Sequence, residues 1–297
     1  MKRRTFIRQT GLASASTALP LPIISRPLAP KYKMGLQLFT VRDVMATDPI
    51  GTLKAVRELG YEDSEIFGYD SENGTFYGLK AKEFRRVIDD LGFGVSSGHY
   101  NFSQFFNGPH TVLKEYLAHC IEGSHLIGAK YITWPWLAPE YRYAEGYKKL
   151  VNLLNHMGEQ VKEGGLSFAY HNHGFEFADL GGQTGYDMIL AGTDEELVKL
   201  QMDMYWVAHS SKTSMAQYIA QNPGRYVMWH IKDMDKVTRD YSELGNGSID
   251  YVSLLSQLDK DALEHIYIEQ GGNFAHNSIQ SITDSAAYFK THLARYF

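Results

Sequence analysis

Short apolar runs alternate along the chain with longer amphipathic stretches. The first apolar run covers residues 34–41 (MGLQLFTV). Seven more cover residues 61–69, 93–102, 130–137, 166–177, 198–207, 226–234 and 265–272. Runs of this length that are rich in β-branched and aromatic residues are typical of buried strands. The pattern therefore predicts eight strands.

A stretch with helical periodicity follows each run. The clearest is Tyr143–Gly164, where the apolar residues recur at helical spacing at Leu150, Leu153, Leu154, Met157 and Val161. Further helices are predicted over residues 51–59, 82–91, a stretch after Pro109, 186–191, 215–221, 249–258 and 278–295. Ser248 or Asp250 is expected to cap the helix over 249–258.

Eight strand–helix units in about 250 residues predict a (β/α)8 barrel, because strands that alternate with helices form parallel crossovers. The alternative is an open doubly wound sheet. However, no GxGxxG follows the first strand, so a dinucleotide-binding fold has no support. No domain boundary or short repeat is visible, and we expect one barrel domain over residues 31–297.

The N-terminus is typical of an export signal. Arg3 and Arg4 precede a short run rich in Ala, Ser and Leu, with small residues as cleavage candidates. RRTFIR resembles the twin-arginine signal, so we expect periplasmic or otherwise exported protein. The run is too short and polar for a stable membrane anchor. Residues 1–30 are therefore interpreted as signal peptide and linker.

Composition narrows the function classes. The net charge is −5 and there is no basic block, which argues against nucleic-acid binding. The single cysteine, Cys120, excludes a disulfide framework or cysteine zinc cluster within one chain. The 20 tyrosines and 15 phenylalanines fill a core or line a pocket for sugar-like ligands.

Titratable residues gather where the predicted strands end. They are Glu65, His99, His171, His173, Glu176, Asp203, His230, Lys232, Asp233 and Glu269. Burying such groups unpaired costs several kcal/mol each. In a barrel of this kind, chemistry takes place at these strand ends and the loops that follow them. A ligand therefore explains the set better than separate pairings do.

The residue types indicate a divalent metal. Imidazoles and carboxylates without thiolates favour Mn²⁺, Co²⁺, Mg²⁺ or Zn²⁺. Such an ion, left with open positions, holds a hydroxyl and a carbonyl oxygen of a substrate. It then stabilises the enediolate formed when a proton leaves the adjacent carbon. A nearby Glu or His serves as base or acid.

Several motifs, in this order and spacing, resemble the sugar phosphate isomerase/epimerase superfamily of xylose-isomerase-like TIM barrels. They are GLQLFTVRD, GYEDSEIFGY, YHNHGFEF, DMYWV, WHIKDM, LGNGSIDY and IEQGG. The resemblance covers about residues 34–296. The YHNH sequence is similar to the branch of inosose dehydratase and keto-glycoside-processing relatives.

The resemblance implies a metal site. Asp203, His230 and Glu269 match the family's metal ligands on strands six to eight. The strand-five ligand is usually Glu, where this chain has His171. Either His171 or Glu176 is therefore expected as the fourth ligand. Because epimerases of the family use two glutamates as paired acid and base, this departure favours a lyase.

The same resemblance implies catalytic roles for His171, Glu269 and His99. Substrate contacts are expected from Gln37, Glu65, His173, Trp206 and Lys232. Three of these residues have a structural alternative. His99 could pack in the core, Glu65 could form a buried ion pair, and Lys232 could pair with Asp233. Tyr205, Trp134 and Trp136 are expected either to form an apolar wall for a sugar ring or to fill the core. The histidines interpreted as helix or loop residues are His110, His119, His125, His156, His265 and His276.

The preferred function is a metal-dependent isomerase, epimerase or lyase acting on a sugar or keto-sugar, with a 3-keto-glycoside as one option. No Arg-rich or Gly-rich phosphate cradle is evident, so we expect an unphosphorylated substrate. Two alternatives are a catalytically degenerate sugar-binding barrel and a metal-dependent endonuclease. Barrels of this family often pair through their helices, which makes a homodimer one expected state.

Overall fold

Eight parallel strands form a closed barrel in the computed structural model, which describes residues 31–297. Each strand pairs with its neighbours in the order β1-β2-β6-β7-β8-β9-β10-β13, and β13 pairs again with β1. The barrel strands are β1 (Met34–Gln37), β2 (Asp63–Ile66), β6 (Ser97–His99), β7 (Tyr131–Trp134), β8 (Ser167–His171), β9 (Val198–Asp203), β10 (Tyr226–Ile231) and β13 (His265–Ile268). The predicted (β/α)8 barrel is confirmed.

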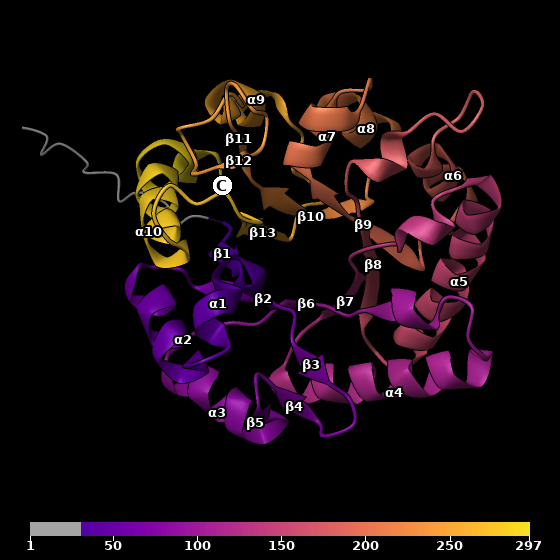
Figure 1. Cartoon of the computed structure of the whole chain (residues 1–297), viewed down its shortest axis with the longest axis horizontal. Helices are drawn as coiled ribbons and strands as arrows, with labels where there is room; N and C mark the ends of the chain where they lie inside the picture. The colour runs from indigo at the N-terminus through magenta and orange to yellow at the C-terminus, as the bar shows by residue number, and fades with distance from the viewer. Residues whose placement is uncertain (1–30) are drawn as a thin grey trace, which may run out of the picture.

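Helices surround the barrel, as Figure 1 shows. They are α1 (Arg42–Met45), α2 (Pro49–Glu58), α3 (Ala81–Asp90), α4 (His110–Ile127), α5 (Ala144–Glu163), α6 (Gly185–Gly192), α7 (Met204–Ser210), α8 (Met215–Gln221), α9 (Tyr251–Gln257) and α10 (Ser278–Tyr288). Asp250 is the cap of α9. The last predicted helix is interrupted, because a π-helical turn follows α10 at Phe289–Leu293.

Several predicted strands end earlier than expected. Residues 38–41 form a 3-10 helix after β1, and residues 204–207 belong to α7 instead of β9. Asp203 ends β9 and caps α7, since its carboxylate accepts the backbone N–H of Trp206. The strand placement of Tyr205 and Trp206 was therefore wrong. The loop or helix interpretation of His265 was also wrong, because His265 opens β13.

A small antiparallel sheet between β2 and α3 was not predicted. It consists of β3 (Tyr69–Asp70), β4 (Thr75–Phe76) and β5 (Leu79–Lys80). Its strands have two residues each, too few for an alternation signal. A second short pair joins β11 (Asp233–Met234) to β12 (Tyr241–Ser242).

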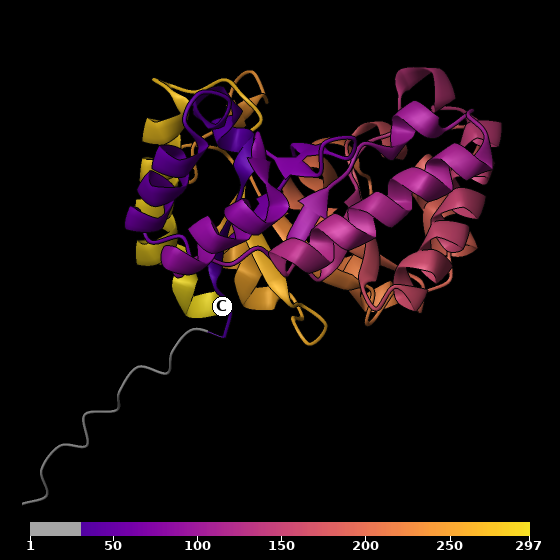
Figure 2. The same ribbon diagram turned by 90° about the horizontal axis from the view of Figure 1, so that it is seen from below.

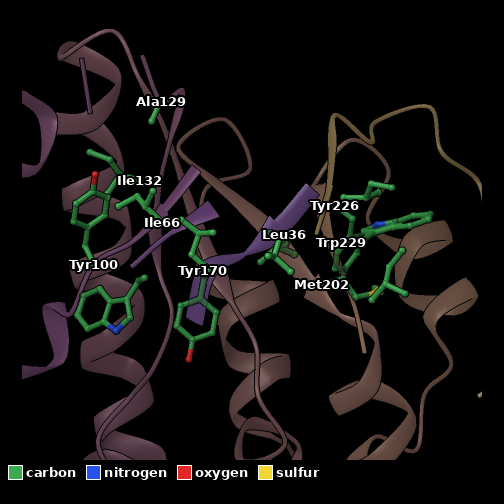
Figure 3. Packing of buried hydrophobic residues seen from close by; sticks show 14 of the residues in the cluster. Leu36, Ile66, Tyr100, Ala129, Ile132, Tyr170, Met202, Tyr226 and Trp229 are labelled. Carbon is green, nitrogen blue, oxygen red and sulfur yellow. The ribbon is translucent and has the colours of Figure 1, made fainter. Parts of the chain in front are cut away.

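Alternation along each strand separates the core from the site. Outward side chains such as Leu36, Ile66 and Met202 are fully buried against the helices (Figure 3). Each contributes about 1.5–3 kcal/mol to stability. Their neighbours Glu65 and Asp203 therefore point into the barrel.

The two ends of the described chain meet at one end of the barrel. The backbone N–H of Lys31 donates to the Phe297 carbonyl at 2.8 Å. Figure 2 shows the C-terminus beside the point where the described chain begins. The export-signal prediction lies outside the described residues. Within residues 31–297, no helix is long and apolar enough to span a membrane.

Candidate metal centre and cavity

The polar side chains at the strand ends converge on the barrel axis. Glu65, Asp203 and His230 are fully buried, and His171 and Glu269 are 1% and 8% exposed. They come from β2, β9, β10, β8 and the residue after β13. Only the closed barrel brings these distant parts of the sequence together.

Glu65 accepts hydrogen bonds on both carboxylate oxygens. Ser97 Oγ and Gln201 Nε2 donate to Oε1 at 2.6 and 2.7 Å. Gln37 Nε2 donates to Oε2 at 2.7 Å. His99 Nε2 lies 3.0 Å from Oε2. Burial raises the pKa of Glu65, but the histidines outweigh it and hold the pKa well below its usual range.

His230 lies between two carboxylates. Its Nε2 is 2.6 Å from Glu65 Oε2, and its Nδ1 is 2.6 Å from Glu269 Oε2. Burial lowers the pKa of His230, but Glu65 and Glu269 outweigh it and raise the pKa to about 9. The His230 ring and the carboxylates of Glu65 and Glu269 are therefore held in a fixed orientation.

Lys232 bridges Asp203 and Glu269. Its Nζ is 2.6 Å from Asp203 Oδ2 and 2.8 Å from Glu269 Oε2. Burial favours a lower lysine pKa, but the two carboxylates raise it above its ordinary value. Burial raises the pKa of Glu269, but Lys232 and His230 have the larger effect. The pKa of Glu269 is therefore lowered.

The alternative pairing of Lys232 with Asp233 is wrong. Asp233 instead accepts backbone N–H groups from the following loop, at Gly245, Gly247 and Ile249. The reason is alternation, because Lys232 points into the barrel on the same side as His230 while Asp233 points away.

The H-N-H segment, which begins at the last residue of β8, supplies two neutral imidazoles. Within residues 31–297, His171 Nδ1 and His173 Nδ1 are buried without a hydrogen-bond partner. His171 Nε2 lies 3.5 Å from Asp203 Oδ2. Burial lowers the pKa of both histidines well below the usual value. Both are therefore uncharged near pH 7.

Glu176 faces away from the proposed ligands. Tyr170 donates its hydroxyl to Oε1 at 2.7 Å, and the backbone N–H of His173 donates to Oε2 at 2.8 Å. Burial raises the pKa of Glu176 to about 7. The structure brings Glu176 under the H-N-H segment but not into either cluster of converging donor atoms.

Two such clusters exist among the described residues, and both include His230. One combines it with Asp203 and Glu269, and the other with His99 and His171. In each cluster the donor atoms lie within 4.8 Å of one another. The set fits a divalent ion, because imidazole and carboxylate are suitable ligands and Glu65 holds the second nitrogen of His230.

Two functional contacts were missed from the sequence. Gln201 joins His99 to Glu65, with Oε1 2.7 Å from His99 Nε2. Asn172 Oδ1 accepts the backbone N–H of Asp203. A signal existed for Gln201, since it precedes Asp203 by two residues and shares its strand face.

A cavity of about 720 Å³ opens above the centre. Its wall includes His99, His171, His173 and Glu269. No lysine or arginine within residues 31–297 lines it, whereas Asp70 and Glu72 do. Trp136 lines the cavity and is 38% exposed, while Trp134 is fully buried in the core.

Of the remaining predicted contacts, Gln37 reaches Glu65 rather than the cavity wall. Trp206 packs against His173, with ring centroids 5.8 Å apart. Neither it nor Lys232 lines the cavity. Gln37, Trp206 and Lys232 therefore contact residues of the centre and do not line the cavity.

The chain belongs to the family described as xylose isomerase-like TIM barrels, whose model matches residues 53–291. No curated protein matches the chain significantly.

Solved structures share the fold. A sugar phosphate isomerase/epimerase from Parabacteroides distasonis superposes with a TM-score of 0.76 at 21% identity, covering 89% of this chain and 99% of that one. The IOLI protein with a bound zinc atom gives 0.69 at 17% identity, covering 89% and 99%. The 3-keto-D-glucoside 4-epimerase from E. coli gives 0.65 at 17% identity, covering 89% and 100%.

Proposed function

We propose that the protein is a divalent-metal-dependent isomerase, epimerase or lyase that acts on an unphosphorylated sugar or keto-sugar. The observation that carries the proposal is the convergence of Asp203, His230 and Glu269 donor atoms within 4.8 Å at the base of a cavity. The family supports it, as do the similar structures of a sugar phosphate isomerase/epimerase and a 3-keto-D-glucoside 4-epimerase.

Asp203, His230 and Glu269 would hold the ion, with His171 as the fourth ligand. When bound, the ion polarises a substrate carbonyl and stabilises negative charge on its oxygen. Glu65 orients His230 through Nε2, which directs Nδ1 toward Glu269. Asn172 fixes the backbone at Asp203.

The cavity wall offers two kinds of proton acceptor. His171 and His99 present imidazoles, and Glu269 presents a carboxylate that its neighbours keep ionised. A residue that holds the ion is less free to take a proton from the substrate, so His99 is the acceptor that stays available. Its Nε2 donates toward Gln201 Oε1 and Glu65 Oε2, which leaves Nδ1 as the nitrogen that accepts the proton. Removal of a proton next to the carbonyl is the step shared by isomerisation, epimerisation and elimination.

The charge of the cavity supports a neutral substrate. Its lining carries carboxylates at Asp70, Glu72 and Glu269 and, within residues 31–297, no lysine or arginine. Arg42 and Arg142 lie over the rings of two lining residues, Phe39 and Trp136, so the support for a neutral substrate comes from the lining carboxylates. The same surface disfavours a DNA backbone, so the endonuclease alternative has less support.

The test is the metal content of the purified protein beside Asp203→Ala and Glu269→Ala. We expect a near-stoichiometric divalent ion that both variants lose. The next assay measures turnover of free 2-keto and 3-keto sugars with added Mn²⁺ or Co²⁺, and we expect at least one of them to be converted. A metal-free protein that neither substitution changes would contradict the proposal and favour the sugar-binding alternative.

Solvent deuterium separates the reaction classes. An isomerase or epimerase incorporates deuterium at the carbon that is reprotonated, whereas a lyase releases a new product with a double bond or a freed leaving group. Mass spectrometry of the products in D₂O decides between them.

We also propose export through the twin-arginine route, supported by Arg3 and Arg4 before the apolar run. Replacing both by lysine is expected to retain the protein in the cytoplasm. Unchanged export of this variant would contradict the route.

A further inference from the structure

An imidazole at the end of β8 lies beside the carboxylate at the end of β9. His171 is the last residue of β8 and Asp203 the last residue of β9, its neighbour in the barrel. Both side chains are buried, and His171 Nε2 lies 3.5 Å from Asp203 Oδ2. The ring centroids of His171 and His230 are 4.6 Å apart, and His230 contacts Glu269. Two imidazoles and two carboxylates therefore meet at this point.

Two polar atoms at this point lack a hydrogen-bond partner within residues 31–297. His171 Nδ1 and Asp203 Oδ2 are both buried without one, although Asp203 Oδ2 also forms an ion pair with Lys232. The 3.5 Å between His171 Nε2 and Asp203 Oδ2 is too long for a strong hydrogen bond. Buried polar atoms are almost always satisfied. An ion held by both residues therefore explains the contact better than a direct hydrogen bond does.

The oxygen ligand that would replace His171 is engaged elsewhere. Glu176 accepts the Tyr170 hydroxyl on one carboxylate oxygen and the His173 backbone N–H on the other. It belongs to neither cluster of converging donor atoms, whereas His171 belongs to one of them together with His230. The donor set is therefore two imidazole nitrogens and two carboxylate oxygens.

Lys232 lowers the negative charge that an ion meets at this donor set. Its Nζ lies 2.6 Å from Asp203 Oδ2 and 2.8 Å from Glu269 Oε2, so one ammonium compensates one of two carboxylates. Mg²⁺ is bound mainly through carboxylates and waters, and it dehydrates reluctantly. Zn²⁺ and Co²⁺ gain more from imidazole. Two imidazoles and a partly compensated carboxylate pair therefore suit the second kind of ion.

We propose that the centre selects Zn²⁺ or Co²⁺ over Mg²⁺, and that His171 is the residue that decides this selection. Its nitrogen adds affinity for ions that bind imidazole well, and it withholds the negative charge that a carboxylate would offer to Mg²⁺. The inference rests on the metal centre of the proposed function and specifies its class of ion. It does not depend on which sugar is the substrate.

The experiment measures metal affinity directly. Purified protein is stripped with EDTA, dialysed and titrated with Zn²⁺, Co²⁺ and Mg²⁺ by isothermal titration calorimetry, with a chromophoric chelator as competitor for the tighter ions. His171→Glu replaces the imidazole by a carboxylate, and His171→Gln removes it without adding charge. His173→Glu is the matched control, because it adds the same charge within the H-N-H segment but outside both clusters. Circular dichroism confirms that each variant is folded.

His171→Glu should lower the ratio of Zn²⁺ to Mg²⁺ affinity by about tenfold or more, because a full charge beside the ion strengthens Mg²⁺ binding. His171→Gln should weaken Zn²⁺ and Co²⁺ about tenfold and leave Mg²⁺ within about twofold. His173→Glu should retain the ratio of the wild type. The visible absorption of bound Co²⁺, which reports its ligands, should change in both His171 variants and not in His173→Glu.

An unchanged affinity ratio in His171→Glu would overturn the inference, and so would an equal change in His173→Glu. A loss of Zn²⁺ affinity in Glu176→Gln as large as that in His171→Gln would identify Glu176 as the ligand and also overturn it. If His171→Glu does not fold, His171→Gln decides, since unchanged Zn²⁺ affinity there contradicts ligation by His171.

The two proposals fail in different ways. If the wild type binds divalent ions but the ratio of their affinities does not depend on His171, only the selection fails. If the wild type binds no divalent ion, the metal centre of the proposed function fails and the selection with it.

Discussion

At the scale of single residues, the site depends on a buried ammonium. Lys232 is 3% exposed, and its Nζ contacts Asp203 and Glu269 at 2.6 and 2.8 Å. Removing one partner of such a buried group leaves charge uncompensated, which is strongly destabilising. The same two carboxylates are the proposed ligands of a divalent ion. Lys232 and the ion therefore neutralise the same charges.

Lys232→Met should lower the free energy of unfolding of the metal-free protein by about 3–5 kcal/mol. Added Mn²⁺ should restore more stability in the variant than it adds to the wild type, because it replaces a missing positive charge. Urea unfolding with and without Mn²⁺ measures both effects. Lys54→Met is the control, since Lys54 and Glu58 form an exposed pair. Equal losses in both variants would contradict the role of Lys232.

The raised pKa of Glu176 predicts that the stability of the protein depends on pH. Its pKa is raised by burial to about 7 in the folded protein, above its unfolded value, so the folded state binds the proton more tightly. This stabilisation is complete below the unfolded pKa and declines as the pH rises toward 7. The total loss is up to about 3 kcal/mol.

Glu176→Gln imitates the protonated acid and retains an acceptor for the His173 N–H. We expect it to raise the melting temperature at pH 8 and leave it nearly unchanged at pH 4.5. Thermal unfolding across this pH range measures the difference. Glu163→Gln, at the end of α5, serves as control. A difference between Glu176→Gln and wild type that does not vary with pH would contradict the assignment.

At the scale of elements, short polar contacts decide where strands become helices. Asp203 ends β9 because its carboxylate caps α7. The apolar run over residues 198–207 continues through this boundary without a change in composition. Periodicity alone therefore extends the strand, whereas the cap ends it.

Asp233 organises the loop that follows β12. It is 1% exposed and accepts the backbone N–H groups of Gly245, Gly247 and Ile249. Asp233→Ala should lower the free energy of unfolding by about 2–4 kcal/mol, since three backbone N–H groups lose their shared, buried acceptor. Asp250→Ala, which removes only the cap of α9, should cost about 1 kcal/mol. Urea unfolding compares the two, and equal losses would contradict this account.

At the scale of the whole molecule, metal binding is expected to stabilise the fold. The four proposed ligands come from the ends of β8, β9, β10 and β13, which are neighbours in the closed barrel although they lie far apart in the sequence. An ion that binds only the folded state raises the free energy of unfolding by about 2.7 kcal/mol at 100 times its Kd. For a chain of this size the melting temperature should rise by about 5–10 °C.

Chelator should reverse this increase, and Asp203→Ala should abolish it. Thermal unfolding with MnCl₂ and then with excess EDTA measures both. Asp284→Ala, on α10 and away from the cluster, should respond like the wild type. An unchanged melting temperature on metal addition would contradict a metal centre.

The sequence by itself determined the barrel. Alternation of apolar runs with amphipathic stretches predicts strands and helices locally, and eight such units favour a closed barrel over the alternative of an open doubly wound sheet. It also indicated which residues gather, because Glu65, Asp203 and His230 end their strands on the inward face. These features depend on the periodicity of apolar residues and on the position of polar residues along the chain, and both can be read from the sequence.

Only the tertiary structure decided which partners these residues take. Lys232 bonds to Asp203 and Glu269 rather than to its neighbour Asp233, and Glu176 turns toward Tyr170. The sheet β3-β4-β5 and its cavity wall also emerged only there. The physical reason is that these contacts join distant segments, and their geometry depends on barrel closure and not on any local pattern.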